Sequence, residues 1–264
     1  MLVVAAHPDD ETVGSGALLC RTKNARVIHV TGGSPLDGKD SRAAGFTNRR
    51  AYAEARRHEA EEALRIAGIG RSAIIHFNFI DQGVSFLLCD LITALLKTFK
   101  QLEPDLVMTH AYEGGHPDHD SVAFACRIAS DIYNQAGGSV PLSLYEFAGY
   151  HGRIGYLMPN EFLPNRDTIH IRNFLSSGDC SKKRQMLSEF RTQQKTLEPF
   201  FSPTWEVYRQ APRYDFSMPP HPGKLFYENF DWGITNGAQW RSLAYRALRE
   251  ILPTRIYAAS SDHP

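Results

Sequence analysis

The stretch LVVAAHPDDE, residues 2–11, decides the fold class of this chain. Its first five residues are apolar, as in a short buried strand, and a histidine and two adjacent carboxylates follow at once. A second stretch has the same form, because the apolar run DLVMT at 105–109 precedes HPDHD at 116–120. In open α/β sheets, ligands bind at the carboxyl ends of the strands. The two stretches therefore predict two halves of one metal site.

Strand-like and helix-like patterns alternate between and after these two stretches. Short β-branched or apolar runs predict further strands at 26–31, 72–79, 105–110 and 142–147. Apolar residues at helical spacing predict helices at 51–67, 86–102, 122–133 and 181–196. Strands that alternate with helices of this length favour βαβ units, hence an α/β fold with a mostly parallel sheet and right-handed crossovers.

The C-terminal part of the chain has a different character. From Pro199 to about Trp232 it is rich in proline and aromatic residues, which disfavour a helix or a central strand. We expect an ordered capping segment or a pocket wall there, because disordered tails are depleted in aromatic residues. A last amphipathic helix is predicted at 239–252. No linker divides the chain, so we expect one domain over 1–264, with a core at 1–198 and the cap and last helix at 199–264.

Composition narrows the class of protein. With 264 residues the chain is long enough to bury a large core, and its 29 basic and 29 acidic residues leave no excess charge for nucleic acid or an anionic membrane. No apolar run approaches the ~20 residues that span a bilayer, and the N-terminus lacks a signal pattern, so a cytoplasmic protein is expected. The oligomeric state stays open, including a homo-oligomer. The four cysteines lack CxxC spacing and are expected to be buried free thiols: Cys20, Cys89, Cys126 and Cys180.

The residue types in the two polar stretches suit a catalytic zinc ion. Such an ion usually takes three protein ligands and leaves one position for water, and His7, Asp10 and His119 fit that set. Neighbouring residues leaving a strand point in different directions, so Asp9 would stay free as a general base. The metal would lower the pKa of the water from about 15.7 towards roughly 7.

Two further residues of the second stretch have expected roles. His116 would stabilise an oxyanion or protonate a leaving amine. Asp118 would orient and charge that histidine. The set His7, Asp10 and His119 also accepts iron or cobalt, so the residues alone do not fix the native metal.

The pair HPDDE at 7–11 and HPDH at 116–119 resembles the two signatures of the LmbE-like, or PIG-L, de-N-acetylases. The resemblance covers roughly residues 1–200 and implies a Rossmann-like three-layer α/β fold, one zinc ion, and removal of an N-acyl group from an amino sugar. By motif match it implies His7, Asp10 and His119 as zinc ligands. It implies Asp9 as the general base and His116 as the electrostatic stabiliser or acid.

Weaker parts of the resemblance suggest substrate contacts. RRHE at 56–59, with a glycine at 68, resembles a family helix and makes Arg56 a candidate for substrate binding. FIDQG at 79–83 resembles an aspartate–glycine turn, where Asp81 would bind sugar hydroxyls. FRTQ at 190–193 resembles a later element of low specificity. The chain departs from members with a tyrosine just ahead of the second motif, because Tyr112 is not in that position.

The leading interpretation is a cytoplasmic zinc-dependent deacetylase acting on an N-acetylated amino sugar or glycoconjugate, a small-molecule partner. Two other classes stay open. A metallophosphoesterase would hold two metal ions about 3.5–4 Å apart between the same stretches. A nucleotide-binding protein would use Gly14-Ser15-Gly16, which lacks the third glycine of the dinucleotide fingerprint. A non-catalytic sugar-binding homologue is the other binding protein considered, although every proposed catalytic residue is present. The substrate and the role of His221 are not predicted.

Overall fold

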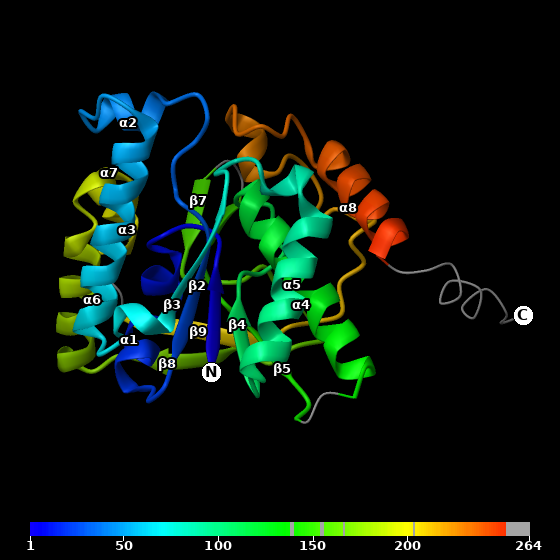
Figure 1. Cartoon of the computed structure of the whole chain (residues 1–264), viewed down its shortest axis with the longest axis horizontal. Helices are drawn as coiled ribbons and strands as arrows, with labels where there is room; N and C mark the ends of the chain where they lie inside the picture. Colours follow the sequence, from blue (N-terminus) through cyan, green and yellow to red (C-terminus); the bar gives the residue numbers. More distant parts are fainter. Residues whose placement is uncertain (138–139, 154–155, 166, 203, 252–264) are drawn as a thin grey trace, which may run out of the picture.

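A computed structural model describes residues 1–137, 140–153, 156–165, 167–202 and 204–251. A seven-stranded sheet forms the middle layer, and helices cover both of its faces (Figure 1). The α/β three-layer fold with a mostly parallel sheet is therefore confirmed.

The sheet has the order β3-β2-β1-β4-β5-β9-β8. Strands β1 to β5 are parallel, β9 is antiparallel to β5, and β8 is antiparallel to β9. Its strands are β1 (Leu2–Ala5), β2 (Arg26–Thr31), β3 (Ile74–Phe79), β4 (Leu106–Thr109), β5 (Ser143–Phe147), β8 (Ile171–Phe174) and β9 (Trp205–Gln210). A separate antiparallel hairpin consists of β6 (Tyr150–Arg153) and β7 (Tyr156–Pro159).

Helices α1, α3 and α6 lie on one side of the sheet and α4, α5 and α8 on the other (Figure 1). The α-helices are α1 (Asp10–Arg21), α2 (Lys39–Ala43), α3 (Arg49–Ile66), α4 (Leu88–Leu102), α5 (Pro117–Gln135), α6 (Ser177–Glu189), α7 (Gln194–Leu197) and α8 (Gly237–Ile251). The 3₁₀ turns are η1 (Arg71–Ala73), η2 (Val84–Phe86), η3 (Arg191–Gln193), η4 (Glu198–Phe200) and η5 (Phe226–Asn229).

Strand β1 is the centre of the molecule, and all four of its residues are buried. Leu2 and Val4 pack into the cluster under α4, α5 and α8, while Val3 packs against Leu19 of α1 on the opposite face. Because successive side chains of a strand point to opposite faces of the sheet, β1 packs against both helical layers. This explains why the run is apolar throughout.

The second polar stretch begins a helix. Pro117 occupies the first turn of α5, and the His116 side chain caps it by accepting a hydrogen bond from Asp118 N. Proline fits there because the first-turn N–H groups have no partner within the helix. Helix α5 therefore starts five residues before the predicted 122, and the helix dipole places partial positive charge beside the acidic stretch.

The C-terminal segment corrects one expectation. Residues 205–210 were expected in a cap, but they form β9, which pairs with β5 on one side and β8 on the other. The aromatic residues Trp205 and Tyr208 suit a strand, and Pro212 lies beyond its end, so no proline interrupts β9 in the described part.

The rest of that segment does cap the sheet. Phe216, Leu225 and Tyr227 join the core under α4 and α5, together with Trp240 of the last helix. All four cysteines are free thiols, as expected, although only Cys126 is fully buried. Among the described residues, no helix is both long and apolar enough to cross a bilayer.

Candidate active site

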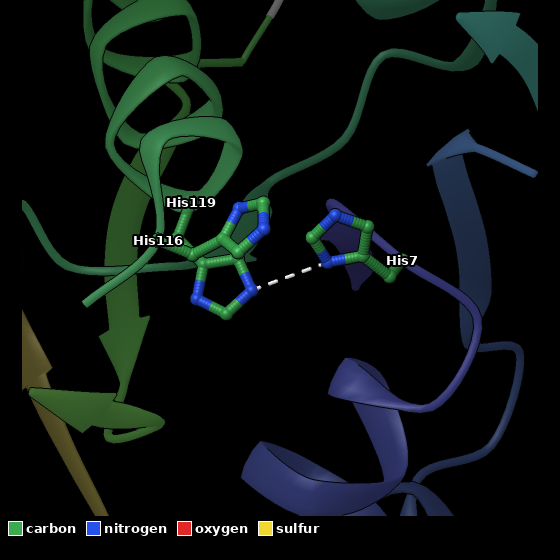
Figure 2. Close-up of side chains that lie close together, drawn as sticks. All are labelled: His7, His116 and His119. Carbon is green, nitrogen blue, oxygen red and sulfur yellow. Dashed lines mark hydrogen bonds between the residues drawn. The ribbon is translucent and has the colours of Figure 1, made fainter. Parts of the chain in front are cut away.

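The two polar stretches meet at the carboxyl ends of β1 and β4. These strands are neighbours, and the strand order reverses between them, which is where open α/β sheets bind ligands. His7 follows β1, while His116 and His119 lie at the start of α5, and the three rings converge on one space (Figure 2).

Side-chain atoms of His7, Asp10 and His119 lie close together, with the two histidines facing different oxygens of Asp10. His7 Nδ1 is 3.1 Å from Asp10 Oδ2 and 3.3 Å from His119 Nε2, which is 3.2 Å from Asp10 Oδ1. Ligand atoms bonded at 2.0–2.1 Å to a tetrahedral ion lie about 3.3 Å apart. The three side chains are 5–8% exposed. The predicted donor residues are therefore close together and buried.

The charge of the site also favours a bound cation. Four buried carboxylates surround this position: Asp9, Asp10, Asp81 and Asp118. Arg56 is a permanently charged cation next to them. Burial opposes ionisation of Asp10, yet the neighbouring His119 and His110 hold its pKa well below the usual range. Buried negative charge in excess is costly unless it is paired or binds a metal, so the donor set fits a divalent ion.

His110, which the sequence analysis did not select, lies behind the donor set. Its ring stacks on His119 at 4.0 Å, and its Nε2 accepts a hydrogen bond from Ala6 N at 2.9 Å. The same Nε2 atom lies 3.4 Å from Asp10 Oδ2, so Asp10, His110 and His119 form a second group of side chains that could hold a metal ion. Burial and the neighbouring His119 lower its pKa to about 4, which keeps the ring neutral. The only sequence signal is a histidine at the end of the fourth strand.

Asp9 has an unusual backbone. Its φ of 130° and ψ of −30° lie where residues other than glycine are rare. Glu11 Oε2 accepts a hydrogen bond from Asp9 N at 3.1 Å, and Arg56 Nη2 contacts Asp9 Oδ2 at 2.7 Å. His29 Nε2 lies 2.9 Å from the same Glu11 oxygen. The Asp9 carboxylate is therefore paired with Arg56, and it also lines the pocket.

Arg56 lines the cavity, where a substrate contact was expected, and it is also bonded within the chain. Its guanidinium is 5% exposed and donates to Gly33 O, to Pro8 O and to Asp9 Oδ2 at 2.7–2.8 Å. These three contacts use both terminal nitrogens, which favours a role in holding Asp9 and the loop before it.

Asp118 also has a different partner from the expected one. Its carboxylate accepts hydrogen bonds from Gln82 N and Val84 N and lies 3.4 Å from His7 Nε2, so it orients His7 and not His116. The reason is helical geometry, because the backbone N–H of Asp118, and not its side chain, faces His116 Nδ1 at 3.1 Å.

His116 is left as a neutral hydrogen-bond donor. Since its Nδ1 accepts a hydrogen bond, a neutral ring carries its proton on Nε2. Burial, together with the positive character of His7 and His119, holds the pKa of His116 well below its usual range. Asp81 Oδ1 lies 3.1 Å from His7 Nε2, so this carboxylate supports a ligand as well as lining the pocket.

A cavity of about 570 Å³ opens over these groups. Its aromatic lining residues come from outside the two motifs: Tyr52, Phe147, Tyr150, Phe200, Phe226, Phe230 and Trp232. The Tyr150 ring lies 5.2 Å from His119, and the Trp232 ring lies 4.6 Å from His116. Tyr112, by contrast, donates to Met218 O and stacks on Trp240, so it takes no part in the site.

Comparison with protein families assigns the first half of the chain. Residues 2–130 match the model of the PIG-L family, described as GlcNAc-PI de-N-acetylase. We refer to these residues, about half of the chain, as the PIG-L segment. This match contains both polar stretches, so it confirms the resemblance that the two motifs indicated.

Curated relatives of this PIG-L segment are deacetylases. The chain is 32% identical over 139 residues to the uncharacterized deacetylase YaiS of Escherichia coli K12, covering 49% of this chain and 66% of the relative. It is 31% identical over 144 residues to the 1D-myo-inositol 2-acetamido-2-deoxy-alpha-D-glucopyranoside deacetylase of Corynebacterium diphtheriae, covering 45% of this chain and 47% of the relative. The chain thus spans about half to two thirds of the length of these relatives.

Solved structures extend the fold match beyond the PIG-L segment. The zinc-inhibited form of teicoplanin deacetylase Orf2 matches with a TM-score of 0.61 at 17% identity, over 81% of this chain and 98% of that one. The N,N'-diacetylchitobiose deacetylase of Pyrococcus horikoshii matches with a TM-score of 0.55 at 18% identity, over 76% and 74%. At these identities the matches show the fold.

The PIG-L segment contains the residues of the two polar stretches, and the later residues supply most of the aromatic wall. His7, Asp9, Asp10, His116 and His119 all lie within 2–130, whereas six of the seven wall residues named above, all except Tyr52, follow it. The family and its relatives favour a deacetylase over the phosphoesterase and binding-protein alternatives.

Proposed function

We propose that this chain is a metal-dependent hydrolase that removes an N-acyl group, acetate in the simplest case, from an amino sugar or glycoconjugate. The observation that carries the proposal is the convergence of His7, Asp10 and His119 at 3.1–3.3 Å beside Asp9, inside a cavity large enough for a sugar. The family match supports the same chemistry.

His7, Asp10 and His119 would hold the metal, and zinc is the ion we propose, because two histidines and a carboxylate are a common ligand set for catalytic zinc. A bound divalent ion would supply Lewis acidity, which polarises an acyl carbonyl and makes water a better nucleophile at neutral pH.

Asp9 would act as the general base. Its carboxylate lines the cavity next to the metal ligands, and the Arg56 contact fixes the direction of one oxygen while the other can accept a proton from water. Arg56 also favours the ionised form of Asp9, against the burial that raises the pKa of this carboxyl to about 8.

His116 would stabilise the tetrahedral oxyanion. Its neutral ring is held by the Asp118 N–H at Nδ1, which leaves the Nε2 proton to be donated. A donor fixed before the reaction needs no reorganisation as negative charge develops on the oxygen, and the same proton is available to the departing amine.

The first experiment measures acetate release from a panel of N-acetylglucosamine conjugates by the zinc-loaded chain and by Asp9→Asn. We expect the wild type to release acetate and the variant to be slower by at least ~100-fold, the usual contribution of a general base. Zinc should be tested at one equivalent and in excess, because a matched structure is a zinc-inhibited form.

The controls separate the parts of the proposal. Asp9→Asn should keep its bound metal, because Asp9 is not among the three donor atoms. Equal rates for both proteins would remove Asp9 from the mechanism, and an absence of release by the wild type across the panel would contradict the proposed substrate class.

A further inference from the structure

Helix α1, which begins beside the metal donors, is interrupted in its middle. Ser15 has φ −143° and ψ 15°, values outside the helical region, so the helix is kinked there. A Cβ on Gly14 would lie 2.1 Å from the Phe147 ring, and one on Gly16 would lie 3.3 Å from the Lys183 side chain. The two glycines therefore let side chains from other elements approach α1 closely at the kink.

A buried ion pair lies at this kink. Lys183 of α6 and Glu206 of β9 are 1–2% exposed, and their charged atoms are 2.7 Å apart. Lys183 Nζ also donates to Val13 O at 2.6 Å. On the other side, the N–H groups of Ala17 and Leu18 donate to the two Glu206 oxygens at 2.8 and 3.1 Å. In an uninterrupted helix the Ala17 N–H would donate to Val13 O, so the pair is inserted into the hydrogen-bond ladder of α1.

The first turn of α1 lies between this ion pair and the metal donors. Asp10 is the first residue of the helix, and Val13, whose carbonyl accepts from Lys183, is one turn further along. Val13 N also donates to Asp9 O at 2.9 Å, and its side chain lines the catalytic cavity. Because residues one turn apart are neighbours on a helix, the contact at Val13 restrains the position of Asp10.

The kink also brings α1 against the residues behind the donor set. The Phe147 ring, which occupies the space beside Gly14, lies 4.8 Å from the His110 ring. His110 in turn stacks on His119 at 4.0 Å. Two of the proposed metal donors, Asp10 and His119, therefore depend on the shape of α1 at this point.

The ion pair has partners for all of its charged atoms, because Glu206 also accepts a hydrogen bond from the Tyr208 hydroxyl. Replacing a buried ion pair by apolar residues of similar size is often neutral or stabilising, so stability alone does not explain such a pair. Lys183 and Glu206 supply three hydrogen bonds to the α1 backbone that aliphatic side chains could not make. Their specific contribution is therefore to the shape of the helix.

We propose that Lys183 and Glu206 are positioning residues for the metal site, which hold the kink of α1 and, through it, Asp10 in place for metal binding. This inference rests on the proposed function and adds to it a determinant of metal affinity outside the PIG-L segment. Neither residue is among those described as lining the catalytic cavity, so their effect on the site passes through α1.

The test measures zinc affinity and backbone protection in the full chain. In competition with a chromophoric chelator, we expect Lys183→Met to bind zinc about tenfold more weakly than the wild type, a loss typical of groups that orient metal ligands. Hydrogen exchange of the metal-free proteins should also become faster at Ala17 and Leu18, whose N–H groups lose a fixed acceptor. Arg21→Met is the matched control, because it removes the ion pair with Asp179 that joins the same two helices away from the kink. Its zinc affinity and its exchange at these two amides should equal those of the wild type.

A second variant separates positioning from stability. Lys183→Met leaves Glu206 buried without its cation, whereas Lys183→Met/Glu206→Gln has no unpaired buried charge and should regain most of the lost stability in urea unfolding without metal. Weak zinc binding should persist in the double variant, because Val13 O still lacks its donor and one acceptor oxygen replaces two. Recovery of zinc affinity together with stability would show a purely structural role and overturn the proposal.

The remaining outcomes separate this inference from the proposed function. Equal zinc affinity of Lys183→Met and the wild type overturns the positioning role and leaves the proposed hydrolysis standing. If zinc affinity falls as expected but the wild type releases no acetate from the sugar panel, the proposed hydrolysis fails while the positioning role stands.

Discussion

The backbone of Asp9 shows how single residues hold the reactive geometry. A non-glycine residue at φ 130° costs on the order of 1–3 kcal/mol and persists only where its surroundings fix it. Glu11 and Arg56 supply that support, one through the backbone N–H and the other through the side chain. This contact explains the glutamate of the first motif. Glu11 orients Asp9, the proposed general base, and does not line the pocket itself.

Trp232 supports the opposite side of the site. Its ring lies between Phe230, stacked at 4.2 Å, and His116, at 4.6 Å. The imidazole of His116 therefore has one face against an indole, which restricts its rotation about the side-chain bonds.

We predict that Trp232→Ala lowers kcat about tenfold, equivalent to about 1.4 kcal/mol of transition-state stabilisation, because His116 loses its support. Trp232→Phe should recover most of this loss, since an aromatic ring remains. Steady-state kinetics that separate kcat from KM, with metal content measured in parallel, provide the check. A rise in KM at constant kcat would show that Trp232 contacts the substrate only.

The sequence allowed us to predict which residues lie together where the signal is local, but not where it depends on distant contacts. His7, Asp9, Asp10, His116 and His119 could be selected as neighbours because each polar stretch follows a strand. The partner of Asp118 could not, because the direction of its carboxylate depends on the turn at Gln82 and on the first turn of α5.

At the scale of elements, β9 links the sheet to a buried charge cluster. Arg209 of β9 pairs across the ladder with Glu146 of β5, and its guanidinium contacts both Glu146 at 2.7 Å and Glu113 at 3.2 Å. Strand β9 escaped prediction because its stability comes from pairing with β5 and β8, and its own composition resembles the proline-rich loops around it.

Two buried carboxyls share this one guanidinium, so one of them tends to keep a proton. Burial raises the pKa of Glu113 to about 8 and that of Glu146 to about 7, although Arg209 acts in the opposite direction. At pH values between the ordinary pKa of glutamate, near 4.3, and these raised values, the folded protein therefore binds more protons than the unfolded chain.

We therefore predict that these carboxyls make the free energy of unfolding fall as pH rises from about 5 to 8. The sign follows because the native state binds more protons than the unfolded state in this range. Glu113→Gln should flatten the slope, since it removes one titrating group and keeps an acceptor for Leu163 N. Urea unfolding of both metal-loaded proteins across this range measures the difference, and identical slopes would contradict the assignment.

At the scale of the whole molecule, the metal site joins two parts of the fold that are distant in sequence. His7 and Asp10 follow β1, whereas His119 belongs to α5, so an ion bound to all three cross-links the helical layer to the sheet. Binding to the native state alone stabilises a protein by about 2.7 kcal/mol at a hundred times the dissociation constant.

Removal of the metal by a chelator should therefore lower the midpoint of thermal unfolding by about 5–10 °C, taking about 2–4 °C per kcal/mol for a chain of this size. Acetate release should be lost and should return when zinc is added. His119→Ala should show no stabilisation by zinc. A His119→Ala protein that zinc still stabilises as strongly as the wild type would place the ion elsewhere.

The division between reactive groups and pocket walls has a practical consequence for changing the substrate range. The last of the proposed catalytic and metal-binding residues is His119, while the aromatic walls begin at Phe147 apart from Tyr52. A library of variants confined to residues 195–202 and 224–230 would alter what the cavity accepts and leave the donor set, Asp9 and His116 untouched. New specificities could then be selected by directed evolution from one half of the chain, with hydrolysis retained as the common screen.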